Sequence, residues 1–456
     1  MSVYAKVVKH FSFPLVAARD GFGKLVRDLH DLNDTQYWSL NRLREYQLDR
    51  IKKLLMHACQ NSPFYKKRFE QCNFDPASFY NLDDLKILPP LKKNDLQNYL
   101  GDIVARNFKE TEIHKDATGG STGNHTPFYR DNKCLGLKKA IEYRCNQWAG
   151  WDIGDKIAYY WPAIQDFAPR KTWKSKIKNQ LSYRSIMLYS GRQDEEILED
   201  HYRQLSLFKP KLVRTFPNPL SILARYIKET GKPSLYIPAI ISVGEPLLNS
   251  HRQLFEQVFG SKVFNCYVSR ECGNMACECG ENPGLLHVNA EMVYIEPLEE
   301  ANGSDTGPVK FLVTDLTNYG MPFIRYQIED LGIFGNETCT CGRGLPVFRM
   351  EAGRASDFLI SPADGSRVSG CSFLHHLIAE GPEVGQIQVI QDRVDHITLK
   401  IVKSAGFREE KLFHFEKVIS MIFKGKMKYD IEYVTNIPRE KSNKYFFTKC
   451  LIAEKK

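Results

Sequence analysis

The chain has 456 residues, enough for about two to four domains of ordinary size. Hydrophobic residues make up 43% and aromatic residues 12% of it, which excludes a disordered chain and permits a core without disulfide staples. The formal net charge of +9 suits an anionic ligand such as a nucleotide but does not require nucleic acid as a partner.

Residues 1–115 are predicted to be mostly helical. The apolar run after Lys6 and Lys9 is short and broken by proline, unlike a signal peptide, and no run of about 20 apolar residues predicts a membrane span. A basic amphipathic helix that packs on the body or touches a membrane surface fits this run better. Apolar residues at helical spacing continue from Leu40 to Phe69, with a break at 61–63.

From about residue 116, short apolar runs alternate with helical segments. Strands are predicted at 155–161, 211–216, 239–244 and 262–268, with helices at 221–230 and 248–259 between them. This alternation is typical of α/β layers with buried strands. After about residue 290 the sequence pattern predicts mostly strands, and the last hundred residues indicate a small α+β domain. We therefore expect three parts: a helical part at 1–115, an α/β core at 116–353 and a lid domain at 354–456.

A loop rich in glycine and hydroxyl residues spans Thr118, Gly119, Gly120, Ser121, Thr122 and Gly123. Glycines let a backbone turn tightly and approach a phosphate, and successive N–H groups form an anion nest. The Lys-Ser/Thr ending of a P-loop is absent, which excludes a P-loop NTPase. The alternative interpretation is a flexible surface turn.

Two further segments carry isolated polar residues. Tyr267 stands at the end of the predicted strand at 262–268 and Glu271 follows it, where functional loops of α/β proteins gather. A glutamate there could bind Mg²⁺ and a tyrosine could stack on a base, although neither residue needs a function when read alone. In the segment 314–332, Asp315 and Asp330 are candidates to accept ribose hydroxyls, with solvent-facing strand charge as the alternative.

The 12 cysteines of a long, ordinary chain indicate a reducing compartment, and we expect the cytoplasm. Two groups are clustered, at 272–279 and 339–341. Four nitrogen and sulfur ligands suit Zn²⁺ in a closed structural site. The favoured ligands are Cys279, His287, Cys339 and Cys341, with Cys277 or Cys272 as substitutes. Free thiols in a reduced core are the alternative.

The order of these motifs resembles the adenylate-forming enzymes. The glycine loop is followed by SVGEPL, Y-x-x-x-E, TDL…PFIRY…ED, GRASD and a late lysine. Within that superfamily the chain resembles the phenylacetate–CoA ligase family, most closely its capsular-polysaccharide (CapK-like) branch. The segments HACQNSPFYKKRFE and LKILPPLKKNDL support this resemblance, which covers nearly the whole chain.

The resemblance implies a role for each matching residue. The loop Thr118–Gly123 would cradle the β- and γ-phosphates of ATP. The remaining roles are the adenine and acyl pocket for Gly244 and Glu245, the face of adenine for Tyr267, Mg²⁺ for Glu271, the ribose for Asp330 and nucleotide binding for Arg354 in the GR..D turn. Asp357 would be the hinge between the two domains, and Lys444 the catalytic lysine. Related members also bind zinc through a Cys…His…Cys-x-Cys arrangement.

Three positions depart from the family pattern: Asn124 replaces a lysine, and Glu329 and Asn443 each replace a glycine. The implied reaction joins a carboxylic acid to AMP, releases pyrophosphate and passes the acyl group to CoA. An amine or sugar hydroxyl as acceptor, and a non-catalytic nucleotide-binding member, stay open as alternatives. A homodimer is also left open, whereas the modest charge disfavours a zinc-based nucleic-acid binder.

Overall fold

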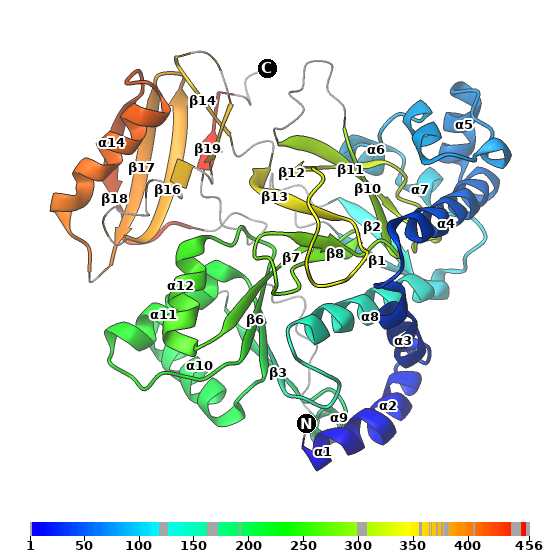
Figure 1. Cartoon of the computed structure of the whole chain (residues 1–456), viewed down its shortest axis with the longest axis horizontal. Coiled ribbons are helices and arrows are strands. Elements are labelled where there is room, and N and C mark those ends of the chain that lie inside the picture. The colour runs from blue at the N-terminus through cyan, green and yellow to red at the C-terminus, as the bar shows by residue number, and fades with distance from the viewer. Residues whose placement is uncertain are drawn as a thin grey trace.

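An 11-stranded mixed sheet runs through the centre of the protein in the computed structural model (Figure 1). The structure describes residues 2–117, 126–161, 172–190, 193–298, 308–354, 358–363, 365, 367–370, 373–374, 377, 382, 384–404, 406–438 and 448–452. From one edge to the other, the strands are β10 (Val293–Pro297), β11 (Val309–Asp315), β12 (Tyr326–Ile333), β13 (Val347–Arg354), β9 (Leu286–Val288), β8 (Gly273–Cys277), β7 (Lys262–Ser269), β6 (Ala239–Val243), β5 (Leu212–Thr215), β3 (Ile157–Trp161) and β4 (Ser185–Tyr189).

Strands β7, β6, β5, β3 and β4 pair in parallel, and helices cover both of their faces. Ile157 and Leu212 pack toward the core shared with α8 (Asn132–Trp148) and α3 (Leu25–Thr35). The next residues, Ala158 and Val213, pack against α10 (Glu195–Phe208), α11 (Pro217–Glu229) and α12 (Asn249–Phe259). This burial on two faces explains why the strands read as continuous apolar runs.

The N-terminal helices wrap one side of this sheet (Figure 1). They are α1 (Val3–Val7), the π-helix η1 (Val8–Ser12), α2 (Phe13–Arg19), α3, α4 (Leu40–Asn61), α5 (Pro63–Gln71), α6 (Lys93–Asn98) and α7 (Leu100–Ile103), with 3₁₀ turns η2 (Pro76–Ser78), η3 (Leu82–Ile87) and η4 (Glu110–Glu112). Helix α4 ends at Asn61 and α5 begins at Pro63, as the break at 61–63 predicts. Proline at the first turn of a helix loses no hydrogen bond, so it starts α5 cleanly.

A hairpin of β1 (Ile113–Ala117) and β2 (Pro127–Asp131) flanks the glycine-rich loop. Between β3 and β4 lies α9 (Trp173–Leu181).

The C-terminal residues form a second, smaller sheet with the order β18-β17-β16-β19. Its strands are β16 (Val384–Arg393), β17 (His396–Lys403), β18 (Lys428–Tyr433) and β19 (Thr448–Cys450), and α14 (Phe413–Ile422) packs on it after the turn η6 (Glu409–Leu412). A short hairpin, β14 (Phe358–Ile360) with β15 (Arg367–Ser369), precedes it. The predicted α/β fold with a small α+β part is therefore confirmed. The predicted boundaries at 115 and 353 stay predictions.

Candidate active site

The carboxyl ends of the parallel strands bring three predicted segments to one end of the sheet. Phe216 follows β5, Gly244 follows β6, and the segment from Tyr267 to Glu271 ends β7 and follows it. Gly244 has φ +74°, and a side chain there would collide with the Phe216 ring. The ring of Trp161, at the end of β3, stands edge-on to Phe216 with centroids 5.0 Å apart. The sheet thus ends in an aromatic wall that a glycine makes room for.

Glu245 follows Gly244 beside this wall, and its carboxylate is held by hydrogen bonds from Asn218. Its carboxylate accepts hydrogen bonds from the backbone N–H of Asn218 at 3.3 Å and from the side-chain amide of Asn218 at 2.9 Å. Asn218 lies in the first turn of α11, where a carboxylate is favoured by the helix dipole. Glu245, only 7% exposed, therefore anchors the loop after β6 to α11.

Tyr267 and Asp330 meet from different halves of the sheet. The Tyr267 hydroxyl donates a hydrogen bond to Oδ2 of Asp330 at 2.6 Å. The Tyr267 ring packs edge-on against Phe311, with centroids 5.8 Å apart. Burial, followed by the Asp330 carboxylate, raises the pKa of Tyr267 well above its usual value. The sequence thus places in contact two residues that lie 63 positions apart.

Glu271 lies in a pocket of buried groups near the same strand ends. Its Oε1 accepts a hydrogen bond from the Tyr326 hydroxyl at 3.2 Å, and no described residue donates a hydrogen bond to its second carboxylate oxygen. Burial, then the Glu271 charge, raises the pKa of Tyr326 well above its usual value. Tyr326 belongs to the predicted motif PFIRY but was not singled out by the sequence analysis.

A buried ion pair holds the backbone of this site in place. The Lys138 ammonium donates to Oδ2 of Asp315 at 2.8 Å and to the backbone carbonyl of Glu271 at 2.7 Å. Burial alone would lower the pKa of Lys138, but the Asp315 carboxylate raises it above its usual value. Asp315 therefore fixes the Glu271 loop through Lys138. A lysine inside the apolar spacing of α8 is the signal that sequence reasoning missed.

The remaining predicted residues are only partly described. The backbone of Arg354 pairs across the sheet with Asp330 at the end of β13. The loop Thr118–Gly123, with Asn124, lies outside the described residues, as do Asp357, Asn443 and Lys444. Arg325, from the segment that carries Asp330, is buried and pairs with Glu296 at 2.7 Å, so it is a structural charge.

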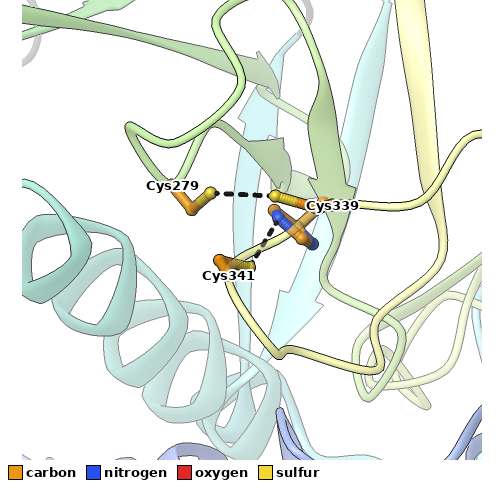
Figure 2. A group of neighbouring side chains, drawn as sticks. Cys279, Cys339 and Cys341 are labelled. Carbon is orange, nitrogen blue, oxygen red and sulfur yellow. Dashed lines mark hydrogen bonds between the residues drawn. The ribbon is translucent and has the colours of Figure 1, made fainter.

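A second cluster brings together the four predicted metal ligands (Figure 2). The ligand atoms of Cys279, His287, Cys339 and Cys341 all lie within 4.8 Å of one another. Sγ of Cys279 lies 3.5 Å from Sγ of Cys339, and Sγ of Cys341 lies 3.4 Å from Nε2 of His287. A tetrahedral zinc ion, with Zn–S bonds of about 2.3 Å, holds its sulfurs roughly 3.8 Å apart. The donor set and its spacing therefore fit Zn²⁺.

The cluster also has the protonation chemistry of a metal site. Burial, followed by the Arg343 charge, lowers the pKa of His287 to about 4, so this imidazole is neutral. Burial would raise the pKa of Cys341, but hydrogen bonds from Arg343 and the neighbouring thiols lower it. A neutral imidazole and a stabilised thiolate are the forms that bind metal.

The proposed substitute ligands belong elsewhere. Cys277 lies with Cys145 and Cys266 in a separate group of buried thiols. Cys272 is fully buried beside the Asp315–Lys138 pair, and burial raises its pKa well above the usual value. Neither residue therefore joins the Cys279 cluster. The two cysteines are core thiols because β7, β8 and α8 enclose them.

Comparison with known proteins adds the family. Residues 359–450 match the family model of the CapK C-terminal domain. The phenylacetate-coenzyme A ligase of Thermus thermophilus is 26% identical over 81% of this chain and 83% of its own. The same-named ligase of Escherichia coli is 25% identical over 71% of this chain and 73% of its own. The chain is therefore similar to phenylacetate-coenzyme A ligases over most of its length and to CapK proteins in its C-terminal part.

Solved structures share the fold of this chain. A 2-hydroxyisobutyryl-CoA ligase in its postadenylation state aligns with a TM-score of 0.73 at 18% identity, covering 91% of this chain and 90% of that one. The same ligase in its thioesterification state aligns with a TM-score of 0.60, covering 92% of both chains. The predicted family is confirmed.

Proposed function

We propose that this protein uses ATP to activate a carboxylic acid and then transfers the acyl group to CoA. The observation that carries the proposal is the pairing of Tyr267 with Asp330 beside Glu271, at the carboxyl ends of parallel strands. Nucleotides bind at such strand ends in α/β proteins. Relatives named phenylacetate-coenzyme A ligase support the same chemistry.

In the first step, a carboxylate oxygen of the acid attacks the α-phosphorus of ATP. The bond from that phosphorus to the bridging oxygen breaks, pyrophosphate leaves and an acyl-adenylate forms. In the second step, the CoA sulfur attacks the acyl carbon, AMP leaves with the bonding pair and the thiol proton is lost to solvent. A free carboxylate could expel only an oxide or hydroxide ion, which is a poor leaving group, so adenylation comes first.

Asp330 is proposed to accept hydrogen bonds from the ribose hydroxyls, since a carboxylate is purely an acceptor. Tyr267 holds that carboxylate in place and offers its ring to the base. Because the Tyr267 hydroxyl has a raised pKa, it stays protonated and keeps donating to Asp330 at neutral pH. The pair therefore presents a fixed acceptor to the nucleotide.

Negative charge accumulates when a carboxylate approaches a phosphate, and cations must offset it. Glu271 is proposed to hold Mg²⁺, which would neutralise phosphate charge when bound. The family resemblance assigns the other contacts to the loop Thr118–Gly123 and to Lys444. Asn124 supplies no cation where relatives have lysine, so we expect weaker hold on the leaving pyrophosphate.

The aromatic wall suggests what kind of acid is bound. Trp161 and Phe216 pack edge-on, and the Phe216 ring lies directly against Gly244, where a side chain would collide with it. We propose an acid with an apolar aryl or alkyl group at this wall. The Cys279 cluster is proposed to hold a structural zinc ion, with no part in either step.

The test is carboxylate-dependent release of pyrophosphate from Mg-ATP over a panel of aryl, alkyl and hydroxy acids, with CoA, an amine or a sugar as acceptor. The variants Asp330→Asn and Glu271→Gln should lower release by about a hundredfold or more. Glu329→Gln, which changes an exposed neighbour, is the matched control.

Thioester formed only with CoA supports the proposal. Acyl transfer to the amine or sugar instead would replace CoA as acceptor. ATP binding without pyrophosphate release for every acid would favour the non-catalytic alternative.

A further inference from the structure

Two helical segments leave rows of apolar side chains in water. The first runs through α1, η1 and α2, and the second is α9. Every fourth residue of the first segment is exposed and apolar, and so is every fourth residue of α9. These residues are Val3, Val7, Phe11 and Leu15 in the first segment and Trp173, Ile177 and Leu181 in α9. Phe11 is 69% exposed and Trp173 is 68% exposed.

The two segments lie side by side at one end of the molecule (Figure 1). The Tyr4 hydroxyl donates to the backbone carbonyl of Gln180 at 2.9 Å, and the Ser12 hydroxyl donates to that of Leu181. Asp20, which follows α2, accepts from the Lys178 ammonium at 2.5 Å. We call the seven exposed apolar residues on this pair of helices the docking face.

The opposite side of the first segment is held by the protein. Val8, Phe13 and Ala17 are buried in the main core. Gly154, with φ +96°, leaves no room for a side chain against the backbone carbonyl of Ala5. The segment is therefore fixed on the body with one face inward, and its outward apolar residues are not a consequence of fraying. An apolar row displayed by a firmly packed helix marks a binding surface.

The charge around the docking face is predominantly basic, although Lys178 and Lys9 pair with Asp20 and Asp152. Residues 2–19 and 172–184 together contain seven lysines and arginines and no aspartate or glutamate. Lys6, Lys174 and Lys176 are exposed. Apolar residues flanked by basic ones are typical of helices that lie in the plane of a membrane surface. We propose that the docking face binds the surface of a bilayer that contains anionic lipids.

A second copy of the chain fits this face less well. In a two-fold symmetric dimer the same patch meets itself, so the lysines would face lysines. Anionic headgroups instead complement the lysines while the acyl region accepts the apolar row. No described helix is long and apolar enough to cross a membrane, so the binding we propose is peripheral.

This position leaves the proposed active site open to solvent. Gly154 precedes β3, so the docking face lies at the amino ends of the parallel strands. Phe216, Gly244 and Tyr267 lie at the carboxyl ends. The enzyme could therefore bind ATP and CoA from water while it rests on a bilayer. The inference stands on the docking face alone and does not need the proposed reaction.

The experiment is cosedimentation of the full chain with vesicles of phosphatidylcholine alone or mixed in equal parts with phosphatidylglycerol. Binding should be about tenfold stronger to the anionic vesicles and should weaken as salt rises. The double variant Phe11→Asp/Trp173→Asp should lose about tenfold or more of that binding. Lys174→Gln/Lys176→Gln should lose binding to the anionic vesicles alone.

Phe413→Asp is the matched control, because Phe413 is 68% exposed on α14 and lies outside the docking face. It should bind vesicles like the parent, and all variants should keep the parent's thermal unfolding midpoint. Equal binding by the Phe11→Asp/Trp173→Asp variant, or no binding of the parent to anionic vesicles at low salt, overturns the proposal. If light scattering shows that the parent is a dimer and that the Phe11→Asp/Trp173→Asp variant is a monomer, the membrane proposal is overturned in favour of self-association.

Discussion

Glu329 holds a backbone conformation that residues with side chains rarely adopt. Its φ is +67°, and its side chain is exposed beside the proposed ribose ligand Asp330. The family resemblance expects glycine at this position. A left-handed conformation is strained for an L-residue because Cβ crowds the backbone. The departure from the family pattern therefore sits at a strained position rather than at a contact.

We expect Glu329→Gly to raise the free energy of unfolding by about 0.5–1 kcal/mol, because relief of strain exceeds the extra chain entropy of glycine. Thermal unfolding of the full chain measures it. Glu329→Ala keeps the strain while removing the charge, so it should show no gain. A gain of the same size in the alanine variant would assign the effect to charge.

Some residues of the site can be recognised from a short sequence motif, whereas others are defined only by partners that lie far away in the sequence. Tyr267, Glu271 and Asp330 stand in short motifs, so their positions could be picked out from the sequence, and the structure places them at one end of the sheet. Lys138 and Tyr326 could not be found this way, because their partners lie 177 and 55 positions away. The roles of Tyr267, Glu271 and Asp330 stay predictions.

At the scale of elements, the Cys279 cluster joins two loops. Cys279 follows β8 and His287 lies in β9, whereas Cys339 and Cys341 lie in the loop between β12 and β13. A bound ion would tie that loop to β9, which pairs with β13. Since β12 carries Asp330, the cluster supports the strand that carries the proposed ribose ligand.

We expect the purified chain to contain about one zinc ion, and its removal by a chelator to lower the unfolding midpoint by several degrees. Elemental analysis and thermal unfolding measure the two effects. Cys341→Ser should reduce both the zinc content and the midpoint. Cys72→Ser, which changes a half-buried thiol outside the cluster, should keep both. Full zinc content in the Cys341→Ser variant would contradict this assignment.

A histidine clamps the smaller sheet. Nδ1 of His396 lies 2.9 Å from Oδ1 of Asp392, and Nε2 lies 3.0 Å from Oδ2 of Asp430. The hydrogen bond with Asp392, more than that with Asp430, raises the pKa of His396 above 6.5. The contribution of protonated His396 to the stability of the folded state is therefore complete below the pKa that this residue has in the unfolded chain. That contribution is lost as the pH rises through the pKa that His396 has in the folded protein.

The smaller sheet should therefore be more stable at pH 6 than at pH 8, by about 0.5 kcal/mol, because both carboxylates are well exposed to solvent. Hydrogen exchange of the amides of β16–β18 in the full chain, corrected for intrinsic rates, measures it. His396→Gln should remove the difference, whereas His414→Gln in the same part of the chain should keep it. A difference that survives in His396→Gln would point to other groups.

Elements could be predicted from the sequence where their pattern is long and local. The buried parallel strands and the helices around them match the expected segments, because burial on two faces leaves continuous apolar runs. Strands β4, β8 and β9 went unpredicted. Strand β8 begins at Gly273 and ends at Cys277, and β9 has only three residues. These two strands are therefore defined by their pairing with neighbouring strands rather than by a sequence pattern of their own.

At the scale of the whole molecule, a hydrogen bond joins the small sheet to the main body. The Arg225 guanidinium of α11 donates a hydrogen bond to the backbone carbonyl of Gly385 in β16. The chain aligns better with a relative in its postadenylation state than with the same relative in its thioesterification state, with TM-scores of 0.73 and 0.60. We infer that Arg225 stabilises the arrangement of the small sheet on the main body that the structure shows.

Under the proposed function, with this arrangement carrying out adenylation, Arg225→Ala should slow adenylation by up to about tenfold, because losing a hydrogen bond of a charged group lowers the population of the arrangement. Thioester formation from preformed acyl-adenylate should proceed at the parent rate, since it uses the other arrangement. Rapid-quench kinetics separate the two half-reactions. Arg203→Ala, on the neighbouring helix α10, changes an arginine paired with Asp200 and should leave both rates unchanged. If Arg225→Ala slowed both half-reactions equally, Arg225 would act on the stability of α11 rather than on the choice between arrangements.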